Sequence, residues 1–388
     1  MISSILDNDF YKFTMQNAVI KMFPRAIVRY EFINRDNTKF PDGFDNELKT
    51  YINNMSKLRL TPSEQQFLSE KYYFLPPTYV DFLKGYVYNP DEVSVSMKNG
   101  ELKIFIEGYW YRTILWEVPL LAIVSELYFI KTKQKIFDKN KIIDIARQKA
   151  LRFNKLGVKV ADFGTRRRFS FNNQDLIVRE MSNYGKEAFT GTSNVILAKK
   201  HNISAIGTHA HEWFMFHSAK YGYKMANKLS LEHWVDIYRG DLGIALSDTF
   251  TSPVFFKDFD TKLAKLFDGI RQDSGDPLKF ADKTINHYKK LNINPLSKTI
   301  IFSDSLNPDK VEEIANYCKD KIKISFGIGT NLTNDVGVRP LNIVIKMTGA
   351  KPEGQNWINT IKLSDDLGKI TGENNAIKLC KDVLGIKH

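Results

Sequence analysis

The stretch Ile203-Ser204-Ala205-Ile206-Gly207-Thr208-His209-Ala210-His211-Glu212-Trp213 decides how this chain folds. Its apolar start predicts a buried strand, and Gly207-Thr208 predicts the turn that leaves the strand. A helical pattern follows from Glu212 to Lys220. In α/β proteins, such a turn directs its side chains into the crevice at the carboxyl end of the strand, where enzymes keep their chemistry. The stretch therefore predicts a strand-turn-helix unit that carries two imidazoles and a carboxylate.

The same pattern recurs through the chain after about Glu117. Short apolar strands end in small polar clusters, and a helical segment follows each cluster. Seven such strand ends lie at residues 162–166, 190–194, 207–211, 247–249, 271–276, 303–305 and 327–331. Alternating units of this length predict parallel strands with right-handed crossovers, and seven in series favour an irregular or incomplete (β/α) barrel. The polar clusters would then meet at one edge of the sheet.

The first third of the chain predicts an α+β arrangement. We expect a helix that ends near Met22, a strand over 28–32, and a helix that starts at Thr61-Pro62-Ser63-Glu64, which has the residues of a capping box. Asn99-Gly100 separates two alternating segments and predicts a hairpin with a type I′ turn. This region should therefore be a sheet with helices.

Three parts of the chain follow from these patterns. We expect an N-terminal α+β domain over 1–120, an α/β barrel-type catalytic domain over 121–341, and a C-terminal segment over 342–388. The C-terminal segment begins with a predicted strand at 343–347 and ends with a predicted helix near 375–384. We expect it to pack back on the N-terminal domain and to complete a sandwich-like α+β domain.

Composition predicts a soluble globular protein. The chain has 388 residues, of which 43% are hydrophobic and 26% are charged, which suffices for a sizeable core. The longest apolar stretch, 115–130, contains Glu117, Pro119 and Glu126 and is shorter than the roughly 20 residues of a membrane span. We expect a buried helix there and no membrane partner.

The N-terminus and the cysteines favour a cytoplasmic protein. Asp7 and Asp9 lie where a secretory signal would carry positive charge. Cys318 and Cys380 are far apart and lack CxxC spacing, so neither a disulfide framework nor a structural zinc site is expected.

The net charge of +12 favours anionic ligands. The lysines are spread along the chain, and no helix shows a basic stripe with interleaved aromatics, so we expect no nucleic-acid partner. A site for phosphorylated small molecules fits better, while a solvated exterior accounts for most of the charges.

Several strand ends have the composition of phosphate sites. Gly327-Ile328-Gly329-Thr330-Asn331 and Ser303-Asp304-Ser305 precede helical segments, where backbone N–H groups bind phosphate, and Gly191-Thr192-Ser193 is a weaker third candidate. A tight turn is at least as good an interpretation of any one of them. Two such clusters on consecutive late strands favour a phosphate site.

Two arginine-containing clusters also follow predicted strands. Arg166-Arg167-Arg168 is a concentrated positive site, and the guanidinium fork suits phosphate or carboxylate. Arg166 is nearest the strand end, whereas a solvated charge run is an equal interpretation of Arg167 and Arg168. Arg271-Gln272-Asp273-Ser274-Gly275-Asp276-Pro277 combines a cation with two carboxylates and suits an anion together with ribose hydroxyls or Mg²⁺, or else a turn with an arginine partner.

The two histidines of the opening stretch allow three interpretations. His-x-His at a strand end is a possible metal pair, but such pairs usually lie on the first strand of a barrel and need further His and Asp ligands, whereas this one follows about the third. A zincin is excluded because the second His of HExxH is missing. Alternatively, a His oriented by the carboxylate of Glu212 could accept a phosphoryl group, while a structural role, as a His hydrogen-bonded in a turn, fits His209 and His217 individually. The residues alone leave these interpretations open.

Motifs across nearly the whole chain resemble those of one family. They include Asp162-Phe163-Gly164-Thr165-Arg166-Arg167-Arg168-Phe169-Ser170 and Gly207-Thr208-His209-Ala210-His211-Glu212-Trp213, and the others lie at 6–12, 114–121, 191–194, 271–277, 302–304, 325–330 and 340–346. At these positions the sequence closely resembles the bacterial nicotinate phosphoribosyltransferases, which have a barrel-type fold of the quinolinate phosphoribosyltransferase-like kind. The two-acid signature of Rossmann-type phosphoribosyltransferases is absent.

The resemblance implies a specific reaction. Nicotinate, 5-phosphoribosyl 1-pyrophosphate (PRPP), ATP and water would give nicotinate mononucleotide, pyrophosphate, ADP and phosphate through a phosphohistidine. Such an ATP-coupled enzyme of the ligase class serves NAD salvage. The resemblance also implies Mg²⁺ as cofactor, ATP as co-substrate, small-molecule partners and a homodimer.

The resemblance implies roles for individual residues, the first being His211 as the phosphorylated residue. Asp273 would orient ribose hydroxyls and the metal, and Arg166 would stabilise the leaving pyrophosphate. Arg271 would hold the nicotinate carboxylate. The remaining implied substrate contacts are Tyr11 and Phe163 around the pyridine ring, Tyr11 across a dimer interface, Thr208 near nicotinate, and Ser303, Asp304, Gly329 and Thr330 around the 5-phosphate and ribose.

Three rival functions stand beside this interpretation. A nicotinamide-specific relative would differ in the base that it accepts, and a metal-dependent barrel hydrolase would hold zinc or iron tightly. A non-catalytic sensor of a phosphorylated ligand would show no turnover.

Overall fold

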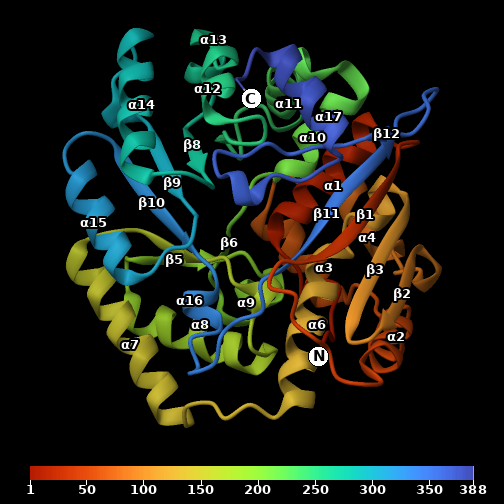
Figure 1. The fold of residues 1–388 in the computed structure, drawn as a ribbon. Helices are drawn as coiled ribbons and strands as arrows, with labels where there is room; N and C mark the ends of the chain where they lie inside the picture. Colours follow the sequence, from red (N-terminus) through yellow and green to blue (C-terminus); the bar gives the residue numbers. More distant parts are fainter. Residues whose placement is uncertain (388) are drawn as a thin grey trace. The chain divides into compact units, whose positions relative to one another are not determined.

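The structure, a computed structural model, describes residues 1–387, and these residues divide into two compact units. Unit 1 comprises Met1–Pro24, Arg29–Gly207 and Ile328–Lys346. Unit 2 comprises Arg25–Val28, Thr208–Gly327 and the chain from Met347 onward. Figure 1 shows the helices and strands in sequence colours.

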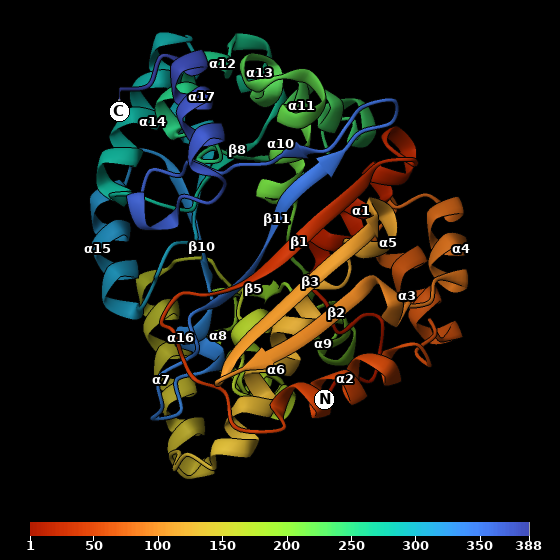
Figure 2. The ribbon, with the colours of Figure 1, turned by 45° about the vertical axis from the view of Figure 1, so that its right-hand side comes forward.

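One sheet joins strands from the first third of the chain to strands near the C-terminus. Its order is β12-β11-β1-β3-β2, and Figure 2 shows β11, β1, β3 and β2 side by side. The strands are β1 (Ile27–Asn34), β2 (Val93–Lys98), β3 (Glu101–Tyr109), β11 (Ile343–Lys351) and β12 (Ile358–Asn359). The predicted α+β domain built from both regions is therefore confirmed, whereas the boundaries at 120 and 341 remain a prediction.

Local sequence signals explain the elements of the N-terminal region. The capping box at Thr61 forms as predicted, because Glu64 N–H donates to the Thr61 side chain while the Glu64 carboxylate accepts from Thr61 N–H. Asn99 and Gly100 both have positive φ, which is the conformation that a type I′ turn requires. The helices here are α1 (Phe10–Met22), α2 (Phe44–Met55), α3 (Pro62–Lys71), α4 (Pro77–Gly85) and α5 (Trp110–Thr113), with the 3₁₀ turn η1 (Pro90–Glu92).

The seven predicted strand ends all follow real strands. They are β4 (Val160–Asp162), β5 (Phe189–Thr192), β6 (Ser204–Ala205), β7 (Ile244–Leu246), β8 (Gly269–Gln272), β9 (Thr299–Phe302) and β10 (Lys323–Ile328). Their hydrogen-bonded order is β6-β5-β4-β10-β9-β8-β7, and the pairs β4–β5, β5–β6, β7–β8, β8–β9 and β9–β10 are all parallel. Over the described residues the sheet is open, with β6 and β7 at its edges, so the predicted incomplete barrel is confirmed.

Helices follow these strands as the periodicity predicts. The helix that opens the region, α6 (Glu117–Thr132), precedes α7 (Lys139–Leu156). After the strands come η2 (Thr165–Arg167), α8 (Phe171–Gly185), α9 (Val195–His201), α10 (His211–Tyr221), α11 (Tyr223–Tyr238), α12 (Ser252–Asp258), α13 (Thr261–Leu266), α14 (Pro277–Lys290), η3 (Pro295–Ser297), α15 (Pro308–Cys318) and α16 (Thr330–Thr333). The chain continues through η4 (Leu367–Lys369) to α17 (Asn374–Leu384).

The register of β7, β8 and β9 aligns three polar strand ends in unit 2. Leu246 pairs with Arg271, and Gln272 pairs with Phe302. Because parallel strands in register end at the same edge, the residues that follow them lie side by side. The clusters at 247–249, 273–274 and 303–304 therefore meet.

The apolar stretch at 115–130 is a buried helix, as expected. The helical stretch Trp110–Thr132 is long and apolar enough to cross a membrane, but 83% of its most apolar window is buried inside the protein. The core helices of soluble proteins have the same property.

The interpretation of Arg168 as a solvated charge is wrong. Its guanidinium is fully buried and donates two hydrogen bonds to the carboxylate of Asp7, of 2.7 and 2.8 Å. Ser125 also donates its hydroxyl hydrogen to the backbone oxygen of Arg168. A bidentate partner compensates the desolvated cation, so Arg168 links the N-terminal segment to the turn after β4.

We predict that Gly164→Ala destabilises the protein by about 1–3 kcal/mol. A Cβ at Gly164 would lie 2.2 Å from Oγ1 of Thr333, and that hydroxyl donates to the backbone oxygen of Gly164. Thermal and urea unfolding measure the loss. Gly85→Ala is the control, because a Cβ there meets nothing within 4 Å. Equal effects of the two substitutions would contradict the close packing at Gly164.

Candidate active site

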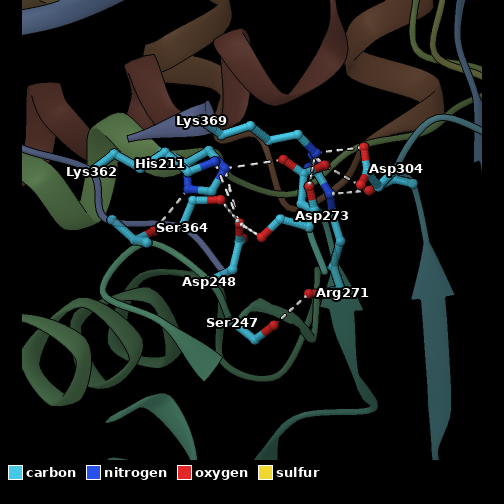
Figure 3. Close-up of polar contacts among 12 residues, drawn as sticks. His211, Ser247, Asp248, Arg271, Asp273, Asp304, Lys362, Ser364 and Lys369 are labelled. Carbon is cyan, nitrogen blue, oxygen red and sulfur yellow. Dashed lines mark hydrogen bonds and ion pairs between the residues drawn. The ribbon is translucent and has the colours of Figure 1, made fainter. Parts of the chain in front are cut away.

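A cluster of ionisable side chains lies beyond β7, β8 and β9 in unit 2 (Figure 3). His211 comes from the start of α10, and Asp248 and Asp273 follow β7 and β8. Lys362 and Lys369 come from the segment after β12. The cluster contains charges of both signs in mostly buried positions, so its members determine one another's protonation.

His211 occupies the first position of α10 and is bound at both ring nitrogens. Nδ1 lies 2.9 Å from the hydroxyl of Thr249, and Nε2 lies 3.1 Å from Oδ2 of Asp273. Burial, together with the charge of Lys362, lowers the pKa of His211 to about 4, although Asp248 and Asp273 act in the opposite direction. The imidazole is therefore neutral at pH 7, and one ring nitrogen carries a lone pair.

Asp273 is the most connected carboxylate of the cluster. Its Oδ1 accepts hydrogen bonds from Arg271 Nη2 at 2.7 Å and from the Ser303 hydroxyl at 2.8 Å. Arg271 Nε also donates to the Ser303 oxygen at 2.9 Å. Burial opposes ionisation, but Arg271 and His211 hold the pKa of Asp273 well below its usual range. The carboxylate therefore stays charged and acts only as an acceptor.

Asp248 is a second carboxylate beside His211. Its Oδ2 accepts from the Ser274 hydroxyl at 2.6 Å and lies 3.4 Å from the ammonium of Lys362. Its buried Oδ1 has no hydrogen bond to the described part of the chain and lies 3.8 Å from Nε2 of His211. Burial acts against ionisation, yet Lys362 and His211 lower the pKa of Asp248.

Residues of the last part of the chain complete the cluster. Lys369 donates to Oδ1 of Asp304 at 2.6 Å and to the backbone oxygen of Asp273 at 3.1 Å. The hydroxyl of Ser364 lies 3.4 Å from Oδ2 of Asp248 (Figure 3). Lys362, Lys369 and Asp248 were not predicted as site residues, because the two lysines follow no predicted strand of the sheet and Asp248 stood out only as part of a polar strand end.

His209 has a different environment from His211. Its Nε2 accepts a hydrogen bond from Leu246 N–H at 3.2 Å, and its ring packs edge-on against Phe214 and Trp234. Burial, together with the charges of Arg271 and His211, lowers its pKa to about 3. This neutral imidazole supports the end of β7.

The cluster has donor atoms that suit a divalent cation. One ligand atom each of His211, Asp248 and Asp273 lies within 4.8 Å of the others. Carboxylate oxygens are the protein ligands that Mg²⁺ prefers, and it commonly takes one or two of them together with substrate phosphates. The two aspartates therefore fit Mg²⁺, and the buried Oδ1 of Asp248 offers an acceptor that a cation would satisfy.

A second group of predicted site residues lies in unit 1. Arg166, in η2, has Nη1 3.4 Å from Oε1 of Glu117 and Nε 3.9 Å from Oδ2 of Asp9. Tyr11 is in α1, where its hydroxyl is buried and its pKa is raised by that burial. Tyr11, Arg166 and Glu117 interact electrostatically and so form one neighbourhood.

The other predicted residues of unit 1 also adjoin one another. Phe163 follows β4 and donates its N–H to the backbone oxygen of Ile328 at 2.8 Å. A Cβ on Gly329 would lie 3.5 Å from the backbone oxygen of Phe163, so the two loops touch. Thr330 begins α16 directly after Gly329.

The predicted site residues thus fall into two groups, one in each unit. Unit 2 brings together His211, Arg271, Asp273, Ser303 and Asp304, whereas the hydroxyl of Thr208 donates to the backbone oxygen of Ile244 on β7. Unit 1 holds Tyr11, Phe163, Arg166, Gly329 and Thr330.

Comparison with known proteins gives the same family over the whole chain. The nicotinate phosphoribosyltransferase (NAPRTase) family matches residues 158–388, and the N-terminal domain of that family matches residues 6–125. A nicotinate phosphoribosyltransferase of Chromohalobacter salexigens is 55% identical over 100% of this chain and 99% of its own length. One of Methanosarcina acetivorans is 45% identical, with the same coverage of both chains.

Solved structures agree with the sequence comparison. The crystal structure of nicotinate phosphoribosyltransferase from Porphyromonas gingivalis has a TM-score of 0.97 and 45% identity and covers 100% of both chains. The Vibrio cholerae enzyme has a TM-score of 0.93 and 33% identity over 100% of this chain and 95% of that one. With a shared fold, full coverage and this level of identity, the chain belongs to the nicotinate phosphoribosyltransferase family.

Proposed function

We propose that the protein is an ATP-coupled nicotinate phosphoribosyltransferase of NAD salvage. It would convert nicotinate, PRPP, ATP and water into nicotinate mononucleotide, pyrophosphate, ADP and phosphate. Beyond the family itself, one observation carries the proposal: His211 is buried and neutral, and a hydroxyl and a carboxylate hold its two ring nitrogens. This is the environment of an imidazole that accepts a phosphoryl group.

The contacts of His211 support a specific tautomer. Ionised Asp273 only accepts hydrogen bonds, so Nε2 carries the ring proton and Nδ1 carries the lone pair, which accepts from Thr249. In the proposed step Nδ1 attacks the γ-phosphorus of ATP, the bond from that phosphorus to the bridging oxygen breaks, and ADP leaves. Asp273 stabilises the positive charge that develops on the ring. Water later accepts the phosphoryl group and releases phosphate.

The second reaction transfers the ribose. As the bond from C1′ to pyrophosphate breaks, positive charge develops on the ribose and negative charge on the leaving group, while the nicotinate nitrogen forms the new bond to C1′. We assign stabilisation of the leaving group to Arg166, and orientation of the ribose hydroxyls to Asp273. Asp273, with Asp248, would hold Mg²⁺, which when bound neutralises phosphate charge.

We assign binding roles to the other predicted residues. Arg271 would bind the nicotinate carboxylate, Tyr11 and Phe163 would stack on the pyridine ring, and Thr208 would lie near nicotinate. The 5-phosphate and ribose would contact Ser303, Asp304, Gly329 and Thr330. Hydrogen bonds of Arg271 to Asp273 and Ser303 support its role, because they fix the orientation of its guanidinium.

We also propose an oligomeric state, a cellular location and domain boundaries for the enzyme. It would act as a homodimer in the cytoplasm, with Tyr11 reaching across the dimer interface, and would bind neither nucleic acid nor membrane. Residues 121–341 would form the catalytic domain, between an N-terminal domain over 1–120 and a C-terminal segment over 342–388.

The central test concerns the phosphorylated residue. With γ-labelled ATP, the wild type should gain acid-labile label on His211, whereas His211→Asn should gain none. His211→Asn should also lose ATP-stimulated turnover but keep slow ATP-independent transfer, because the site for nicotinate and PRPP remains.

His209→Gln is the matched control for this test. Glutamine offers an oxygen that can accept the hydrogen bond from Leu246 N–H, so labelling should persist. Label mapped to His209, or to no histidine at all, would overturn the assignment.

The second prediction concerns pH. Because the pKa of His211 is lowered to about 4, the protonated form, which is not nucleophilic, accumulates only near and below that pH. An imidazole with the ordinary pKa would lose about three quarters of its neutral form between pH 8 and pH 6. We therefore expect the single-turnover labelling rate to change by less than about twofold over this range. A fall that follows a pKa near 6.5 would contradict the buried environment.

The third prediction concerns the choice of base. Arg271→Gln should lower kcat/KM for nicotinate by roughly 2–5 kcal/mol of transition-state free energy, since the substrate carboxylate would lose its cation. Activity with nicotinamide should change much less. The kcat/KM of Arg271→Lys for nicotinate should lie between those of the wild type and Arg271→Gln, because lysine keeps the positive charge but cannot bind the carboxylate with two parallel hydrogen bonds. Equal losses with both bases would refute this role and point to Arg271 as a support for Asp273 alone.

A further inference from the structure

Glu117 is a buried carboxylate of unit 1 that none of the proposed roles uses. It is the first residue of α6, and it is 8% exposed. Its Oε2 lies 2.6 Å from the ammonium of Lys12, and its Oε1 lies 3.4 Å from Nη1 of Arg166. One carboxylate thus bridges two cations that come from different elements of the unit.

The two cations belong to segments that carry predicted site residues. Lys12 is fully buried in α1, next to Tyr11, and its ammonium lies 5.5 Å from the centre of the Tyr11 ring. Arg166 lies in η2, the turn that follows β4. Glu117 therefore joins the helix that carries Tyr11 to the turn that carries Arg166.

The charge balance explains why a carboxylate is required at this point. Lys12, Arg166 and Lys346 all act electrostatically on Glu117, and together they outweigh its burial and hold its pKa at about 2. Asp9 also faces Arg166, but burial raises the pKa of Asp9. Glu117 is thus the more firmly ionised of the two carboxylates. Without its charge, the buried ammonium of Lys12 and the partly exposed guanidinium of Arg166 would lose the anion that lies between them.

We propose that Glu117 is a positioning residue for Arg166. By accepting from Lys12 and Arg166 together, it fixes the guanidinium relative to α1, so that Arg166 is preorganised for the charge that develops on a departing pyrophosphate. This inference rests on the proposed function and deepens the role of Arg166. Glu117 itself touches no reacting atom in this scheme.

The variant Glu117→Gln tests the proposal, because glutamine keeps the shape and removes the charge. We expect kcat/KM for PRPP to fall at least tenfold and inorganic pyrophosphate to bind at least fivefold more weakly. Labelling by ATP should stay within twofold of the wild type, since His211 and its partners lie in unit 2. Glu117→Asp should recover part of the loss, because the charge returns on a shorter side chain.

Glu126→Gln is the matched control, since it removes another carboxylate from α6. Glu126 accepts from Phe171 N–H at 3.2 Å and lies 4.0 Å from Nε of Arg168. Its loss should lower the unfolding temperature but leave kcat/KM for PRPP within twofold. A structural role of Glu117 would give this same pattern and would overturn the proposal.

A double-mutant cycle separates positioning from stability. In an Arg166→Gln background, Glu117→Gln should have less than a twofold further effect on pyrophosphate binding, because the group that it positions is gone. A full, additive effect in that background would refute the proposal. If Glu117→Gln does not fold, Glu117→Asp enters the same cycle. Pyrophosphate binding needs no turnover, so this outcome stays distinct from a wild-type protein that shows no nicotinate transfer at all.

Discussion

The parallel register of β7, β8 and β9 is the constraint on which the unit 2 site depends. It places the residues after Leu246, Gln272 and Phe302 at one edge, and these residues include Asp248 and Asp273. The backbone ladder therefore gathers like charges that would not assemble by themselves. The fold then compensates them with Arg271, Lys362 and Lys369, so that the electrostatics of the site follow from the pairing of the sheet.

Asp273 is the member of the cluster that shares hydrogen bonds with most of the others. It accepts from Arg271, Ser303 and His211, and its backbone oxygen accepts from Lys369. A single carboxylate thus sets the tautomer of an imidazole and the orientation of a guanidinium. Any change of its charge would alter both at once, so the protonation of His211 and the orientation of Arg271 are physically linked.

Much of the fold was predictable because its signals are local. The seven strand ends, the hairpin at Asn99-Gly100 and the capping box at Thr61 each depend on residues within one short segment. The position of His211 and Asp273 after strands was predictable in the same way, whereas the roles expected of them came from the resemblance to the family. The grouping of His211, Arg271 and Asp273 in one cluster also follows from parallel strands with polar ends.

The remainder depends on contacts between distant segments. Nothing near Lys362 or Lys369 in the sequence indicates that they neutralise Asp248 and Asp304, because tertiary packing alone brings them there. The interpretation of Arg168 as a solvated charge was wrong for the same reason, because its partner Asp7 is 161 residues away in the sequence. The sequence showed Glu117 only as a charged residue within an apolar helix. Its contacts with Lys12 and Arg166 could not be predicted, because these two cations come from other elements.

The late position of Lys362 and Lys369 has a consequence for synthesis on the ribosome. A growing chain that ends before residue 362 already contains His211, Asp248 and Asp273 but lacks both ammonium groups. In such a chain two close carboxylates would face each other without their counter-ions, which disfavours the compact arrangement. The charge-balanced cluster around His211 can therefore form only after residues 362–369 have been added to the chain.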